Sequence, residues 1–67
     1  MNRIRKLRTA AGMTQQDLAW ETDLSIRTVA ELDAGKQERA HPNTLKALAF
    51  ALEWPEDRYK ELLEEVA

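Results

Sequence analysis

The side chains that could take part in chemistry are of types, and at spacings, that do not suit catalysis. The chain has no cysteine and a single histidine, His41, so it offers neither a thiolate nucleophile nor a cysteine- or histidine-rich metal cluster. It has no glycine-rich loop to cradle a phosphate, and its Ser and Thr residues stand at expected helix starts rather than beside a base. We therefore expect no enzymatic activity, no cofactor and no metal site.

The charged side chains are better suited to local recognition than to long-range attraction. The formal net charge is −2, although 33% of the residues are charged. Residues 1–13 are basic with no acidic residue, 14–35 carry five acidic residues against Arg27, 36–46 are again net basic, and the rest is acidic. Attraction to a nucleic acid would therefore be weak at long range and would depend on local geometry. The alternative is a solvated surface with ordinary charge clustering.

The length limits the chain to one domain, residues 1–67. Sixty-seven residues leave no material for a second domain or an internal repeat. No apolar run is long enough to span a bilayer, and the charged N-terminus is not followed by the apolar stretch of a signal peptide. We expect a soluble intracellular protein that binds no membrane.

Apolar periodicity and capping residues predict an all-α chain of five short helices. Thr14 and Ser25 are expected N-caps, because their hydroxyls can accept from free backbone N–H groups. Gly12 and Gly35 are expected helix stops, and the two prolines can occupy first helical positions. The expected helices are 2–11, Gln15 to about Glu21, Ser25 to Gly35, Pro42 through Leu52, and Pro55 through Val66.

The second and third of these helices form the most informative pair. Only about four residues join them, which forces a steep crossing, as in a helix-turn-helix. Ala19 is small where the two helices must approach closely, and Asp23 stands in the turn, where a left-handed backbone is often needed. Four apolar residues are expected to meet in the angle between the helices: Leu18, Leu24, Val29 and Leu32.

Residues 4–63 resemble the Cro/CI-type helix-turn-helix domain of phage repressors and related bacterial regulators, the lambda-repressor-like DNA-binding domains. The resemblance rests on the order and spacing of three segments, IRKLRTAAGMTQQDLA, LSIRTVAELDAGK and HPNTLKALAFAL. It implies an all-α, five-helix bundle with a central helix-turn-helix, about residues 15–34, that binds operator DNA, usually as a homodimer, and regulates transcription. The expected location is then the bacterial cytoplasm or nucleoid.

The resemblance implies that Ser25–Glu31 forms the outward face of the recognition helix. A helix fits the major groove, and side chains near its exposed N-terminal end reach base edges. Arg27 can pair with guanine O6 and N7, Ile26 can touch a thymine methyl, Thr28 can bond a base or a phosphate, and Glu31 can accept from cytosine N4. The candidate phosphate contacts are Thr14, Gln15, Gln16, Ser25, Lys36 and Arg39. Each can alternatively be an ordinary solvated residue.

Two further groups of residues receive structural interpretations. By resemblance, Arg8 and Asp33 form a partly buried ion pair between the first helix and the end of the recognition helix. Three other basic residues are expected on the solvated face of the first helix, with contact to DNA as the alternative: Arg3, Arg5 and Lys6. Phe50, Trp54 and Tyr59 are expected where the last two helices meet, as core or subunit contacts. Trp20 lies outside the buried stripe and can lean on a neighbouring helix, contact the DNA backbone or meet a partner protein.

Three functions remain open at this stage. The leading hypothesis is a sequence-specific transcriptional regulator, a Cro-like or compact bacterial repressor, that binds a near-palindromic operator in double-stranded DNA as a homodimer without a small-molecule ligand. The last helix and the loop before the fourth are the candidate dimer surface. The alternatives are a helix-turn-helix module used mainly for protein–protein interaction, and an antitoxin-like subunit of a larger complex.

Overall fold

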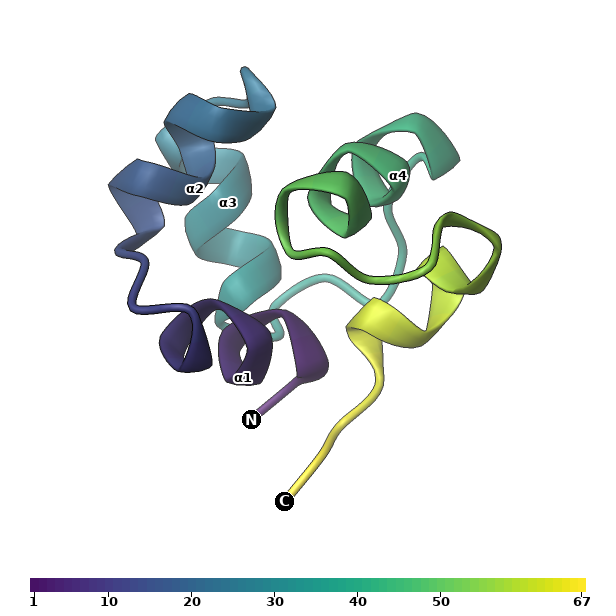
Figure 1. Ribbon diagram of the computed structural model, residues 1–67. Helices are drawn as coiled ribbons and strands as arrows, with labels where there is room; N and C mark the ends of the chain where they lie inside the picture. The colour runs from purple at the N-terminus through teal and green to yellow at the C-terminus, as the bar shows by residue number, and fades with distance from the viewer.

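The computed structural model describes every residue from Met1 to Ala67 and confirms the all-α prediction. The chain forms four α-helices and one 3₁₀ helix: α1 (Arg3–Ala10), α2 (Gln15–Thr22), α3 (Ile26–Asp33), α4 (Pro42–Ala51) and η1 (Glu56–Leu63). In Figure 1, α3 passes behind α2, α1 runs beneath this pair, and α4 and η1 complete the opposite side. No helix has the length and apolarity that crossing a bilayer requires.

Side-chain caps begin the two helices of the central pair where the sequence predicts. Thr14 Oγ1 accepts the N–H of Asp17 at 3.0 Å, and the Asp17 carboxylate accepts the N–H of Thr14 at 2.9 Å, which completes a capping box at α2. Ser25 Oγ accepts the N–H of Thr28 at 3.1 Å and caps α3 in the same manner. The starts of α2 and α3 are therefore determined locally.

The other residues predicted to end or begin helices also do so in the structure. Gly12 and Gly35 follow α1 and α3 with φ of 72° and 75°, a backbone region that residues with a Cβ rarely adopt. Pro42 opens α4, and His41 caps this helix because its Nδ1 accepts the N–H of Asn43 at 3.1 Å. His41 thus has a structural partner at a helix start.

One core joins all five helices. The four residues expected between α2 and α3 pack there, although Leu24 is only half-buried. Asn2 and Asp33 are the only buried polar residues, and both lie where α1 meets α3, Asn2 as the N-cap of α1 and Asp33 at the end of α3. The ten buried apolar residues are Ile4, Leu18, Ala19, Val29, Leu32, Leu45, Leu48, Ala49, Leu52 and Leu62.

The last helix differs from the prediction of a regular helix from Pro55 through Val66. The chain forms the 3₁₀ helix η1 instead, Pro55 precedes it, and Arg58 departs from helical geometry with φ −111° and ψ 24°. Beyond η1 the backbone pairs with the start of the chain, because Arg3 N–H donates to Glu64 O and Val66 N–H to Met1 O. The chain makes these long-range hydrogen bonds instead of continuing the helix, because a short helix is only marginally stable.

The aromatic residues divide into packed and exposed ones. Trp54 is half-buried, with the guanidinium carbons of Arg3 and Arg58 at 5.0 and 4.9 Å from its ring centroid, and Tyr59 is also half-buried. Phe50 is 88% exposed and Trp20 is 85% exposed. The expectation of core packing for Phe50 is therefore wrong, as is the possibility that Trp20 leans on a neighbouring helix, because most of each side chain is in contact with solvent.

Candidate nucleic-acid interface

The turn between α2 and α3 sets the angle of the helix pair. Asp23 adopts the predicted left-handed conformation with φ 58°, and the N–H of Leu24 donates to Ala19 O at 3.2 Å. Buried Leu18 and Ala19 on α2 meet the buried side of α3, so the two helices are held rigidly against each other. The opposite side of α3 is left for solvent.

The N-terminal half of α3 carries the exposed side chains of this helix. Ile26 and Arg27 are exposed, Thr28 and Glu31 are partly exposed, and Val29 between them is buried. In Figure 1, α3 begins at the turn and runs down behind α2. An exposed helix end with short and long polar side chains has the shape required for entry into the major groove.

Arg27 and Glu31 contact each other along α3. Arg27 Nε lies 3.9 Å from Glu31 Oε2, and Gln37 Nε2 donates to Glu31 Oε1 at 3.2 Å. Because the Arg27 side chain is 88% exposed, this ion pair is weak and leaves the guanidinium free to reorient. Glu31 keeps acceptor capacity beside these two contacts, since an ionised carboxylate has about four acceptor sites.

The hydroxyls of Ser25 and Thr28 are not equivalent. Ser25 Oγ donates its hydrogen to Thr28 Oγ1 at 2.9 Å while it accepts the N–H of Thr28. The Ser25 hydroxyl is thus occupied by the helix cap. Thr28 keeps its own hydroxyl hydrogen for an outside acceptor, such as a phosphate oxygen or a base edge.

The first turn of α2 combines features that attract and repel a phosphate. The backbone N–H groups of Gln15 and Gln16 precede the first intrahelical hydrogen bond and suit an anion. Thr14 Oγ1 is occupied by the capping box. Asp17 is exposed, and the hydrogen bond from the Thr14 backbone holds the pKa of its carboxyl below the ordinary value, so it stays ionised. A phosphate would have to approach these N–H groups from the side away from Asp17.

A buried carboxylate lies beneath this surface. The Asp33 side chain has no exposed area, and its oxygens receive Arg8 Nε at 2.7 Å, Arg5 Nε at 2.9 Å and Gln15 Nε2 at 3.0 Å. Burial by itself would raise the pKa of Asp33, but the hydrogen bonds from Arg8, Gln15 and Arg5 outweigh it and hold the pKa below its usual value. Asp33 therefore ties α1 and α2 to the end of α3.

This cluster changes the role of two residues. The Gln15 amide donates one hydrogen to Asp33, which orients the side chain and leaves the second hydrogen for another acceptor. Arg5 does not lie on a free solvated face, as the sequence analysis expected, because it shares Asp33 with Arg8. The spacing of Arg5 and Arg8, three residues apart on one helix face, is the signal that could have indicated a common partner.

Asn2 is a second residue that the sequence reasoning missed. It is 2% exposed, its Nδ2 donates to Leu32 O at 2.6 Å, and its Oδ1 accepts the N–H of Arg5 at 3.0 Å. Its position before the first apolar repeat is the sequence signal of an N-cap. By capping α1 and holding Leu32, Asn2 fixes the far end of α3.

The cations differ in their availability for DNA. Arg3 is bound to Glu64 at 3.0 Å and Lys6 Nζ donates to Ala67 O, so the basic start of the chain is largely used internally. Lys36 and Arg39 are exposed in the loop between α3 and α4 and take part in no ion pair within the molecule. Together with Arg27, they are the cations that this side of the molecule offers to phosphates.

Comparison with known families matches residues 2–62 to a family described as a helix-turn-helix domain, within the Cro/CI-type group. The match includes α1 to α4 and most of η1. No curated protein and no solved structure matches the chain.

Proposed function

The chain belongs to the Cro/CI-type family of helix-turn-helix DNA-binding domains, and from this premise we propose that it is a sequence-specific transcriptional regulator. The observation that carries the proposal is the exposed N-terminal half of α3, supported from behind by the buried Asp33 cluster. A rigid, projecting helix loses little conformational freedom when it enters the major groove.

Base reading is assigned to α3. Arg27 pairs with guanine O6 and N7 after it releases its weak contact with Glu31. Ile26 meets a thymine methyl, and Thr28 donates to a base edge or a phosphate. Glu31 accepts from cytosine N4 or stays bound to Gln37, so its contact with a base depends on how it turns relative to Gln37.

Phosphate contacts surround this helix. The N–H groups of Gln15 and Gln16 and the second amide hydrogen of Gln15 face one strand, while Lys36 and Arg39 supply charge from the loop. Thr14 and Ser25 contribute through the backbone that they cap. Few cations take part, so we expect a shallow dependence of affinity on salt.

A homodimer is part of the proposal. An open groove of about 270 Å³ lies between the loop before α4 and η1, with apolar walls that include Leu45, Tyr59 and Leu63. Its lining includes Glu38 and Lys60, so two copies related by a two-fold axis can pair unlike charges while Arg39 stays available to DNA. Two recognition helices held in this way read two half-sites of a near-palindromic operator, and occupancy of that operator represses transcription.

The test is enrichment of random DNA duplexes on the purified protein at physiological salt, followed by sequencing. We expect two similar half-sites with centres about one helical turn apart. A single half-site would refute the dimer, and retention without any preferred sequence would refute specific regulation.

A second function is favoured by one observation. The exposed carboxylate of Asp17 stands beside the reading surface, which itself contains the carboxylate of Glu31 and the apolar Ile26. This mixture also suits a helix-turn-helix module that mainly binds another protein. An NMR titration with duplex DNA separates the two functions, because a DNA reader must show shifted resonances over residues 15–39.

A further inference from the structure

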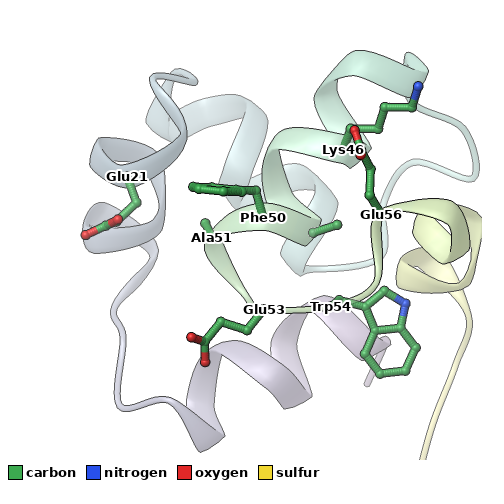
Figure 2. Close-up of a pocket in the computed structure, with 8 residues that line it drawn as sticks. Glu21, Lys46, Phe50, Ala51, Glu53, Trp54 and Glu56 are labelled. Atoms are coloured by element: carbon green, nitrogen blue, oxygen red, sulfur yellow. The ribbon is translucent and has the colours of Figure 1, made fainter.

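A second surface lies away from the recognition helix, where the C-terminal ends of α2 and α4 meet. An open groove of about 600 Å³ is lined there by Glu21 of α2 and by residues from Lys46 of α4 to Glu56 at the start of η1. Figure 2 shows the Phe50 ring reaching from α4 toward α2, with the carboxylates of Glu21 and Glu53 on the same side, whereas Trp54 and Lys46 point to the other side. The groove thus combines a projecting aromatic ring with carboxylates around it.

The charges of the groove are not balanced within the molecule. Its lining contains Glu21, Glu53 and Glu56, none of which takes part in an ion pair. The single cation of the lining, Lys46, lies over the Tyr59 ring with its Nζ 5.6 Å from the centroid. The surface therefore repels DNA and attracts a cationic partner.

Phe50 is the apolar centre of this surface. At 88% exposure it gains almost nothing from burial in the free protein, although aromatic rings are the side chains that most often dominate protein interfaces. The ring projects outward instead of lining an enclosed cavity. This shape fits a pocket on another protein better than it fits a small ligand.

The acidic residues occupy positions that are unfavourable for the free protein. Glu53 follows the C-cap of α4 with φ 58°, a left-handed conformation in which glycine is preferred. Glu21 lies in the last turn of α2, and carboxylates near helix C-termini oppose the partial negative charge there. A cationic partner would remove the electrostatic part of this cost.

We propose that the groove formed by Glu21, Phe50 and Glu53 binds a basic segment of another protein, which covers Phe50 with apolar side chains and meets the two carboxylates with Lys or Arg. The groove is separate from the surface assigned to DNA, so the chain can hold both partners at once. This proposal does not depend on DNA binding.

The probe is a peptide selected on the immobilised protein from a random library displayed on phage. We expect the selected sequences to combine an apolar residue with Lys or Arg, and the synthetic peptide to shift NMR resonances of α4 and the end of α2. Selection of acidic sequences, or shifts confined to α3, would overturn the proposal.

Two variants and one control then separate binding from structure. Glu53→Gly should raise the thermal unfolding midpoint, because it relieves the backbone conformation, and should weaken peptide binding about tenfold. Phe50→Ser should abolish peptide binding without unfolding the chain, while Asp57→Asn, at an exposed carboxylate that lines neither groove, should bind as the wild type. DNA affinity should be unchanged in all three variants.

The proposal fails if Glu53→Gly binds the peptide as tightly as the wild type. It also fails if Phe50→Ser removes a concentration-dependent self-association instead of peptide binding, because the groove would then hold a second copy of this chain.

Discussion

Replacement of Asp33 by asparagine tests whether the buried carboxylate holds the bundle together. The substitution keeps the size and two hydrogen-bonding atoms of the side chain but removes its charge. Asp33 is fully buried, and the side chains of Arg8 and Arg5 that reach it are 13% and 39% exposed. Asp33→Asn therefore leaves Arg8 with little compensation and Arg5 partly solvated.

The expected loss follows from these exposures. Breaking a buried ion pair by removal of one partner costs about 3–5 kcal/mol, whereas an exposed pair contributes about 0–1 kcal/mol. We place Asp33→Asn at about 3 kcal/mol, Arg8→Ala at about 2 kcal/mol and Arg5→Ala below about 1 kcal/mol. A domain of this length has a free energy of unfolding of roughly 3–10 kcal/mol, so Asp33→Asn removes a large part of it.

The pH dependence of this loss is a second, independent signature. The pKa of Asp33 is depressed in the folded state, so its contribution is fully present above the unfolded pKa of about 3.9 and is lost as the pH falls through the folded pKa. The difference in the free energy of unfolding between wild type and Asp33→Asn should therefore become smaller at acid pH. Asp17 and Glu61 also have lowered pKa values, but they are present in both proteins and cancel.

Urea unfolding at neutral and at acid pH, followed by tryptophan fluorescence, measures these free energies, because Trp54 is half-buried and becomes exposed whereas Trp20 is exposed already. If Asp33→Asn does not fold, the free energies of unfolding of Arg8→Ala and Arg5→Ala still test the role of burial. A loss in Arg5→Ala equal to that in Arg8→Ala would refute the reasoning from burial. A difference between wild type and Asp33→Asn that stays constant with pH would refute the electrostatic reasoning.

Three further predictions concern the interface and its support. Arg27→Ala should lose about 1–3 kcal/mol of discrimination at one base step, measured by competition between duplexes, and Arg27→Lys should not restore it because lysine lacks the bidentate fork. Equal losses on all duplexes would contradict base reading. Lys36→Ala and Arg39→Ala should each weaken binding to every duplex and reduce the slope of log affinity against log salt by about one in a titration, and an unchanged slope would exclude a phosphate contact. Thr14→Ala should lower the free energy of unfolding by about 1 kcal/mol in urea, because the capping box of α2 is lost, and no change would show that the cap is replaced by solvent.

Features that depend on neighbours along the chain were predictable from the sequence. Thr14 and Ser25 begin α2 and α3 because a hydroxyl reaches an N–H three residues away, and this reach is the same in any protein. Gly12 and Asp23 adopt the left-handed conformations that end α1 and α2 for equally local reasons. The family resemblance, which rests on the spacing of such signals, agrees with the family match.

Features that depend on distant segments were not predictable in this way. The final turn is a 3₁₀ helix because Glu64 and Val66 pair with the first residues of the chain, and helical periodicity carries no information on such pairing. The exposure of Phe50 and Trp20 depends on which neighbouring helix covers each side of α4 and α2. The sequence shows that a side chain is apolar, but it does not show whether another helix packs over it.

The candidate interface contains both kinds of feature, those fixed locally and those that depend on distant segments. The sequence by itself determined which side chains stand on the outer face of α3, because helical geometry places Arg27 opposite Val29 and the predicted N-cap at Ser25 places Ile26 at the exposed start of the helix. Only the tertiary structure decided how α3 is held, because Asp33 gathers donors from α1 and α2 that lie 18 to 28 residues away along the chain. Burial makes each of these charged groups depend on the others, and burial is a property of the assembled bundle.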